Sequence, residues 1–288
     1  MASIINTNLL SLNAQRNTAA SQSSLATSLQ RLSSGLRVNS AKDDAAGLAI
    51  SERLNAQVRG SNVAIRNAND GISLSQTAEG ALSKVNDSLQ RMRELAVQSR
   101  NATNTSADKD SLDKEFGELS KEIQRVLGGT TFNGRAILAT ADAGTQTFQV
   151  GANTTSNDRI DVVTTDMTTD ATITAVAGTD NTGAGRAVID NTATGATIDS
   201  VIDNIDKAIN TVSSQRATLG AAQNRMDQVI SNLQISVENQ SAAKSRITDA
   251  DFAQETANLS RANILQQAGN AMIAQANQIP SQVLSLLR

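Results

Sequence analysis

Residues 198–237 read IDSVIDNIDKAINTVSSQRATLGAAQNRMDQVISNLQISV. Apolar side chains recur here at alternating spacings of four and three, which place them along one face of an α-helix. Two polar residues, Arg216 and Gln223, interrupt the series. Either they fix the register of a buried seam or they face solvent, and the sequence leaves both alternatives open. The full series is Ile198, Ile202, Ile205, Ile209, Val212, Arg216, Leu219, Gln223, Met226, Ile230, Leu233 and Val237.

The same spacing predicts two more long helices. One extends from about residue 48 to residue 98 and includes the series Leu82, Val85, Leu89, Met92 and Ala96. The other covers residues 112–126 and follows a polar loop in which Thr105 and Asp108 have capping-box spacing. Three such helices can bury each other's stripes in antiparallel packing. The fold class is therefore mainly α, with heptad-packed helices forming a rod.

The composition limits the class of protein. The chain has four Phe, one Pro, and no Trp, Tyr, Cys or His, which favours long packed helices over a globule with an aromatic core. The net charge is −3 without a Lys/Arg cluster, so nucleic acid is not an expected partner. Neither a run of about 18 apolar residues nor an ordinary signal sequence is visible, so membrane insertion is not expected.

Both ends of the chain carry apolar stripes on a nearly uncharged background, and Arg16 is the only charged residue in the first 30. Such helices need partner helices, because too little charge surrounds the stripe for a freely solvated surface. We expect residues 1–42 and 250–288 to form a two-helix coiled coil that is completed by assembly. Its polymerisation contacts are predicted at Ile5, Leu9, Leu12, Leu29, Leu32, Leu36, Leu265, Met272, Ile279, Val283 and Leu286.

Two junctions connect these ends to the rod. Ser40 precedes Asp43 by three residues, and Thr248 precedes Asp251 by three. Each pair is a helix-start pattern of the Ser/Thr-x-x-Asp kind. The spacing predicts hinges near residues 34–46 and 244–251, with the rod formed by residues 43–139 and 198–249.

The remaining segment, residues 140–197, is rich in Thr, Asp, Gly, Asn and Ala. Phe132-Asn133-Gly134 is a turn pattern, and residues 146–150 and 159–163 are expected to form the strands of a β-hairpin. Residues 164–197 give a weaker pattern, which fits one or two further hairpins or an irregular loop.

We find no catalytic constellation. Without His and Cys, the common nucleophile–base pairs and imidazole or thiolate metal sites are excluded. Asp43 and Asp44 are adjacent and are better explained as helix caps than as an acid–base pair. The acidic run 180–190 lacks the alternation of a calcium loop, and residues 128–131 lack the P-loop lysine. We expect a non-enzyme without a metal or cofactor.

Several longer motifs carry a family resemblance. They are LQRLSSGLRVNSAKDDAAGLAISERL at 29–54, RMRELAVQS at 91–99, FNG at 132–134, FQVGA at 148–152, LGAAQNRMD at 219–227, SRITDADFAQE at 245–255 and the closing ILQQAGNAMIAQANQIPSQVLSLLR. With these motifs the chain resembles the bacterial flagellins over about residues 1–160 and 198–288. The short middle segment is similar to flagellins that lack large outer domains.

The resemblance implies a subunit of the flagellar filament, which serves as a propeller for motility. In that family the terminal helices form the inner tube, the rod and β-hairpin form the surrounding wall, and the middle segment faces outward. The resemblance also implies a secreted, extracellular homopolymer, exported unfolded through the flagellar type III channel. Expected partners are further copies of the chain, an export chaperone, the filament cap and the hook-associated proteins.

The resemblance extends to innate immune recognition by host flagellin receptors. Residues 30–51 are similar to the segment that plant receptors bind. Arg91, Leu95 and Glu115 match positions that the animal receptor contacts, and the 91/95 spacing places the first two on one helix face. The alternatives are the related hook–filament junction protein and, from a different class, a soluble coiled-coil adaptor or adhesin.

Overall fold

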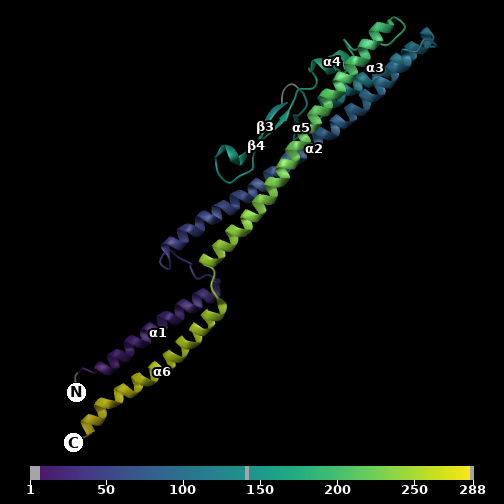
Figure 1. Cartoon of the computed structure of the whole chain (residues 1–288). Coiled ribbons are helices and arrows are strands. Elements are labelled where there is room, and N and C mark those ends of the chain that lie inside the picture. Colours follow the sequence, from purple (N-terminus) through teal and green to yellow (C-terminus); the bar gives the residue numbers. More distant parts are fainter. Residues whose placement is uncertain (1–6, 140–142, 286–288) are drawn as a thin grey trace. The chain divides into compact units, whose positions relative to one another are not determined.

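The computed structural model describes residues 7–139 and 143–285, with side chains up to residue 278. Its long helices are α1 (Leu9–Ser34), α2 (Ala45–Ser99), α3 (Ser106–Gly129), α5 (Gly195–Thr248) and α6 (Phe252–Ser285) (Figure 1). Between α3 and α5 lie the strands β1 (Thr131–Phe132), β2 (Arg135–Ala136), β3 (Gly144–Gln149) and β4 (Arg159–Thr164), and the short helix α4 (Ala171–Ala177). The predicted fold class, mainly helical with a small hairpin region, is confirmed.

The chain divides into two compact units. Unit 1 consists of Met1–Val58 and Glu238–Arg288, and unit 2 consists of Arg59–Val237. The boundary therefore falls inside α2 and α5, whereas the sequence places the domain junctions at the ends of those helices. The difference arises because α2 and α5 continue without a break into residues that pack with unit 1.

In unit 2, α2, α3 and α5 bury their apolar stripes together, as their periodicity predicts. Leu89, Phe116 and Ile205 are among the fully buried side chains of one shared core. Ion pairs between α2 and α5 show that the two helices are antiparallel. Arg93 Nε lies 2.6 Å from Asp206 Oδ1, and Arg100 Nε lies 2.9 Å from Asp199 Oδ1. The residue numbers of the paired positions therefore increase along α2 and decrease along α5.

The two polar interruptions of the α5 stripe meet one residue of α2. Gln223 Nε2 donates to Glu79 Oε2 at 3.2 Å, and Arg216 Nη2 lies 3.6 Å from Glu79 Oε1. All three side chains are only partly exposed. The structure therefore favours the first alternative, in which the polar residues fix the register between α2 and α5.

The predicted cap of α3 is confirmed. Thr105 accepts the Asp108 backbone N–H, and the Asp108 carboxylate accepts the Thr105 backbone N–H and hydroxyl. The side-chain hydrogen bond from Thr105, together with that from its backbone N–H, lowers the pKa of Asp108. This reciprocal arrangement satisfies donors that a helix N-terminus otherwise leaves unpaired.

The predicted turn at residues 132–134 and the predicted hairpin strands are also confirmed. β1 and β2 pair across the two-residue turn Asn133–Gly134, where φ is 50° and 78°. Left-handed conformations at both turn positions match the twist of a tight hairpin, and Asn and Gly tolerate them best. β3 and β4 form an antiparallel pair from Gly144↔Thr164 to Gln149↔Arg159.

The segment after β4 differs from both sequence alternatives, because it contains the helix α4. Four β-branched residues in this seven-residue helix, Thr172, Ile173, Thr174 and Val176, favour a strand by intrinsic propensity. The helix forms because the Asp170 side chain caps its first turn and because Ile173, Val176 and Ala177 are buried in the unit 2 core. Tertiary packing thus overrides local propensity here.

Candidate assembly surface

In unit 1, α1 and α6 form an antiparallel pair. Near the start of α1, Asn8 Nδ2 donates to the carbonyl of Ala276, late in α6, at 2.8 Å. Near the end of α1, Ser28 Oγ donates at 3.0 Å to Glu255, which lies in the first turn of α6. Asn8 also caps α1, because its side chain accepts the Ser11 backbone N–H. The predicted two-helix pairing of the ends is thus present along the described residues.

Small residues form the seam between the two helices. The small buried residues are Ser11, Thr18 and Ser28 on α1, and Ala262 and Ala276 on α6. At Gly269 a Cβ would overlap Thr18 Oγ1, so glycine lets the helices approach without displacing this hydroxyl. The seam therefore buries little apolar surface compared with a leucine-lined coiled coil.

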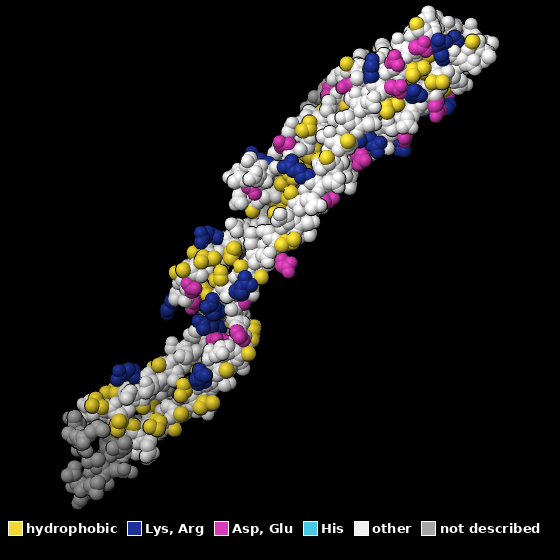
Figure 2. All heavy atoms as spheres, viewed as in Figure 1, with side chains coloured by type: hydrophobic (Ala, Val, Ile, Leu, Met, Phe, Trp, Pro, Cys, Tyr) yellow, Lys and Arg dark blue, Asp and Glu magenta, His cyan; other side chains and the backbone are white. Residues whose placement is uncertain are grey.

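The large apolar side chains of the pair lie outside this seam. Leu9 is 65% exposed and Met272 is 63% exposed, and Leu12, Leu29 and Leu265 are each at least half exposed. Leu32 and Leu36 are half-buried. Figure 2 shows apolar side chains on the described surface of the pair. Ile5 and Leu286 lie outside the described residues, as do the side chains of Ile279 and Val283.

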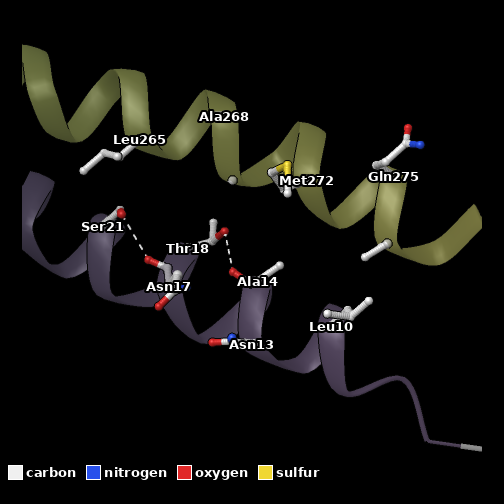
Figure 3. A pocket seen from close by; sticks show the side chains of 12 residues that line it. Leu10, Asn13, Ala14, Asn17, Thr18, Ser21, Leu265, Ala268, Met272 and Gln275 are labelled. Carbon is white, nitrogen blue, oxygen red and sulfur yellow. Dashed lines mark hydrogen bonds between the residues drawn. The ribbon is translucent and has the colours of Figure 1, made fainter. Parts of the chain in front are cut away.

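Some of these side chains line a groove of about 380 Å³ between α1 and α6 (Figure 3). Leu10 from α1, with Leu265 and Met272 from α6, supplies its large apolar surface. The other lining residues are small or carry amides or hydroxyls, and none is charged: Asn13, Ala14, Asn17, Thr18, Ser21, Ala268, Gly269, Gln275 and Ala276.

One charge lies in the seam, at the end where the pair joins the rest of unit 1. The Glu255 carboxylate is nearly buried, accepts from Ser28 Oγ, and lies 3.7 Å from Arg31 Nη1. A buried carboxylate needs such partners, since without them its desolvation would oppose pairing of the helices.

The two junctions contact each other within unit 1. Arg37 N–H donates to the Thr248 carbonyl at 2.7 Å, and Ala250 N–H donates to the Gly35 carbonyl at 3.0 Å. The Arg37 guanidinium also donates to the Ile247 carbonyl. These bonds hold the two segments predicted as hinges together as a short antiparallel contact.

Of the residues predicted as caps at the junctions, Asp44 and Asp251 cap helices, whereas Ser40, Asp43 and Thr248 do not. Asp43 accepts from the Ser40 backbone and hydroxyl, and these bonds lower its pKa, but the pair closes a turn before α2. Asp44 is the side chain that caps α2, through the Gly47 N–H. Thr248 ends α5, and Asp251 itself caps α6 by accepting the Ala253 and Gln254 N–H groups.

The predicted receptor residues lie in unit 2, where Arg91 and Glu115 are exposed and Leu95 is not. Arg91 bridges Glu94 and Glu115, with its Nε 2.8 Å from Glu115 Oε1, and these hydrogen bonds raise the pKa of Arg91. Leu95 is fully buried in the core. Its side chain therefore does not share the exposed surface on which Arg91 and Glu115 lie.

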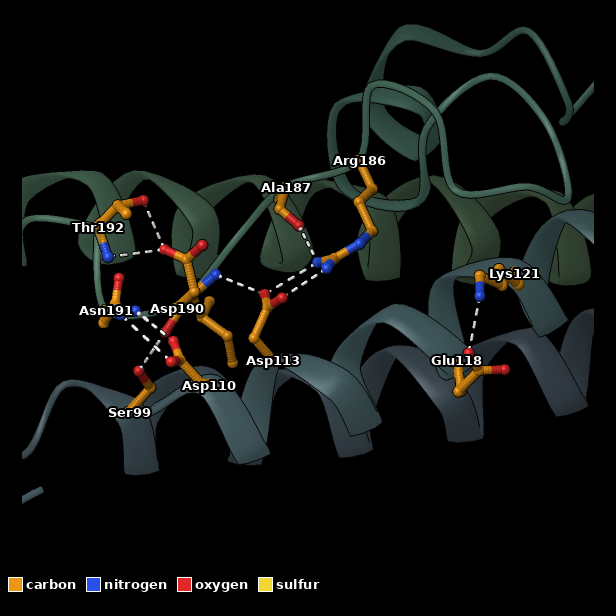
Figure 4. Close-up of polar contacts among 11 residues, drawn as sticks. Ser99, Asp110, Asp113, Glu118, Lys121, Arg186, Ala187, Asp190, Asn191 and Thr192 are labelled. Carbon is orange, nitrogen blue, oxygen red and sulfur yellow. Dashed lines mark hydrogen bonds and ion pairs between the residues drawn. The ribbon is translucent and has the colours of Figure 1, made fainter. Parts of the chain in front are cut away.

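A polar cluster in unit 2 has no counterpart in the sequence predictions (Figure 4). Arg186 Nη1 donates to Asp113 Oδ1 at 2.9 Å, and the Ile189 N–H donates to the same oxygen. Asp110 accepts from the backbone and side chain of Asn191. These contacts hold the segment before α5 against α3. No local spacing signals them, since the partners are more than 70 residues apart.

Within residues 7–139 and 143–285, no group of three or more His, Cys, Asp or Glu could hold a metal ion. None of the helices in these ranges combines the length and apolar character that crossing a bilayer requires.

Comparison with known proteins identifies the family. The bacterial flagellin N-terminal helical region matches residues 5–143, and the C-terminal helical region matches residues 202–287. A flagellin of Halalkalibacterium halodurans is 48% identical and a flagellin of Bacillus subtilis is 44% identical, each over 99% of this chain and at least 99% of the relative. A flagellar hook-associated protein of Vibrio parahaemolyticus, 17% identical, shares the fold over 72% of this chain and all of its own, with a TM-score of 0.58. Because both family regions and the full-length relatives cover nearly the whole sequence, this chain belongs to the bacterial flagellins.

Proposed function

We propose that this flagellin polymerises into the flagellar filament through the apolar side chains that α1 and α6 leave exposed. The proposal rests on the packing of the pair, which is the reverse of an ordinary coiled coil. Small residues lie in the seam, and the large apolar residues Leu9, Leu265 and Met272 lie outside it. Burying one such side chain is worth about 1.5–3 kcal/mol. Contacts between different faces of successive copies then extend into an open helical polymer.

The same packing supports completion of the ends on assembly. A pair of helices joined by a seam of small residues gains little from burial to offset the entropy of ordering two long segments. We expect the pair to be only weakly stable in the isolated subunit and to become stable when neighbouring copies cover its stripes. By sequence pattern, Ile5, Ile279, Val283 and Leu286 belong to the same set of contacts.

The test is growth from filament seeds, followed by electron microscopy. Replacing Leu265→Asn together with Met272→Gln should abolish elongation, because it removes apolar surface that a neighbouring copy would cover. The subunit itself should still fold, because both side chains are more than half exposed and contribute little to its own core. Val163→Thr is the matched control, since Val163 is also an exposed apolar residue but lies on β4 in unit 2. Elongation of the double variant at the rate of the unaltered chain would contradict the proposal.

The remaining partners rest on the family resemblance. They are an export chaperone that holds the C-terminal segment, the filament cap at the growing end, and the hook-associated proteins. Export in an unfolded state to the extracellular filament is supported by the weak seam of the pair, because a weakly stable pair costs little to keep open before assembly. The role proposed is structural and not enzymatic.

Immune-receptor recognition is proposed for the exposed ion-paired residues of unit 2. Arg91 and Glu115 are accessible, whereas Leu95 is buried in the core of unit 2. Arg91→Ala should weaken signalling in cells that carry an animal flagellin receptor. Arg93→Ala is the matched control, because Arg93 is similarly exposed and similarly paired, with Asp206. Equal signalling by the two variants would remove Arg91 from the site.

The 48% identity to a full-length flagellin favours the filament subunit over the junction protein. The junction alternative makes a distinct prediction in the same experiment. A junction protein would bind an existing end without extending it, so the unaltered chain would fail to elongate seeds.

A further inference from the structure

We infer that successive copies join through a ridge of one terminal pair and the groove of another. The ridge consists of Leu9 and Leu12 on α1, and the groove is the cavity lined by Leu10, Leu265 and Met272. This inference rests on the proposed polymerisation and deepens it, since it names which surface of one copy meets which surface of the next.

The groove has the properties of a binding site for an apolar side chain. Its volume of about 380 Å³ falls within the usual range of protein ligand pockets, about 300–1,000 Å³. Leu265 and Met272 are two helical turns apart on α6 and form one wall, with Ala268 and the Gly269 backbone between them (Figure 3). Small residues at the centre and large ones at the ends leave a hole that a leucine can enter.

The ridge lies on another face of the same helix. Leu9 and Leu12 are three residues apart and therefore adjacent on the surface of α1, and both are at least half exposed. The α1 residues that line the groove are Leu10, Asn13, Ala14, Asn17, Thr18 and Ser21, and neither Leu9 nor Leu12 is among them. Because α1 is a rigid helix, Leu9 and Leu12 cannot enter the groove of their own chain. The geometry therefore points to a second copy of the chain as the occupant of the groove.

The placement of charge agrees with this pairing. Arg16 is one turn beyond Leu12 on the ridge face, is exposed, and forms no ion pair within residues 7–139 and 143–278. The groove carries no charge, and its Asn13, Asn17 and Gln275 amides offer oxygens that a guanidinium can contact. The ridge can therefore approach the groove without like-charge repulsion.

Since ridge and groove are different surfaces, the contact is heterologous. A contact of this type leaves one ridge and one groove free at the ends of any oligomer, so it propagates. A contact between identical patches would instead close as a two-fold dimer. The cysteine-free sequence allows a direct distinction by disulfide formation.

The experiment uses seeded filaments grown from a mixture of L12C and A268C chains. Copper phenanthroline in air oxidises two facing thiols to a disulfide, with dioxygen accepting the two electrons and two protons. We expect a disulfide-linked dimer in the mixed filaments and its loss when either cysteine is omitted, because a disulfide needs Cβ atoms about 3.5–4.5 Å apart. A single chain carrying both substitutions should give a ladder of linked multimers.

N181C replaces A268C in the matched control, since Asn181 is exposed in a loop of unit 2 outside the pair. L9C, the second ridge position, is tested against A268C in the same way. Filaments that grow normally but form neither the L12C–A268C nor the L9C–A268C dimer would overturn the inference. Dimers in filaments of one variant alone would overturn it too, because they indicate an identical-patch contact. Failure of the unaltered chain to extend seeds would instead refute the proposed function itself.

Discussion

Unit 2 and the terminal pair of unit 1 carry the same apolar periodicity but bury opposite residues. In unit 2 the stripes of α2 and α5 face each other, so that side chains such as Leu82 and Leu89 are completely buried. In the terminal pair the seam holds Ser, Thr, Gly and Ala, and the large apolar residues are exposed. A helical stripe therefore shows that a partner is needed, but not whether the partner belongs to the same chain.

The charge around the stripe distinguishes the two cases. The helices of unit 2 carry ion pairs on their outer faces, such as Arg125–Glu122 and Lys121–Glu118. Such pairs contribute little to stability but keep an outer face solvated. The first 30 residues contain only Arg16, so the outer face of α1 has almost no such groups. This contrast is readable from sequence, and the following predictions test it.

The largest effect is expected from truncating one leucine in each region. Leu89→Ala should lower the free energy of unfolding by about 2–5 kcal/mol, because it leaves a cavity in a fully packed core. Leu265→Ala should change it by no more than about 0.5 kcal/mol, because Leu265 is half exposed in the subunit. Urea denaturation followed by circular dichroism measures both.

Seeded elongation should reverse the order of the two variants. We expect Leu265→Ala to slow elongation strongly, and Leu89→Ala to elongate normally at temperatures where the subunit remains folded. A loss of unfolding free energy at Leu265 comparable to that at Leu89 would show that the terminal stripe is buried within the subunit.

The next effect concerns the contact between Asp113 and Arg186, both of which are largely buried. Removing one charge leaves the other without its partner, so Asp113→Asn should cost about 3 kcal/mol. Burial alone would raise the pKa of Asp113, but hydrogen bonds from Arg186 and Ile189 outweigh it and lower the pKa. The stabilisation by the Asp113 carboxylate is thus fully present above its pKa in the unfolded chain, about 4. It is lost as the pH falls through the lower pKa of the folded state.

Hydrogen exchange of residues 178–193 at pH 6 and pH 3 checks this prediction. Protection should decrease at pH 3 in the unaltered chain and should be low at both pH values in Asp113→Asn. The terminal pair provides the internal comparison, since the Asp113 contact lies in unit 2. Unchanged protection at pH 3 would mean that the carboxylate does not hold this segment.

The helices were predictable because a long stripe repeats the same information many times, as in residues 198–237. Thr105 with Asp108, and Asn133 with Gly134, were predictable because their contacts are local. The helix α4 and the Asp113–Arg186 pair were not, because they depend on residues brought together only by folding. The seam of the terminal pair was not predicted for another reason. A helical stripe is defined by large apolar residues, whereas this seam is formed by small residues such as Ser11, Thr18 and Gly269.

The smallest effects are expected at three glycines, where one added methyl group tests the packing of each region. At Gly80 a Cβ meets no atom within 4 Å, so Gly80→Ala should stabilise α2 by about 0.5–1 kcal/mol. At Gly71 it would lie 2.5 Å from Met226 Cε and 3.2 Å from Phe148 Cγ, so Gly71→Ala should cost about 1–3 kcal/mol. Both values are measured by urea denaturation of unit 2.

Gly269→Ala makes the corresponding change in the terminal pair, where the added methyl group would overlap Thr18 Oγ1. Because the seam contributes little to the stability of the subunit, we expect denaturation of unit 2 to be unaffected. Elongation from seeds should nevertheless slow, since separating α1 from α6 at this point widens the groove between Leu265 and Met272. Gly80→Ala is the control that should elongate normally. If Gly269→Ala instead destabilised the subunit as much as Gly71→Ala, the seam of small residues would be as important to the isolated chain as the leucine core.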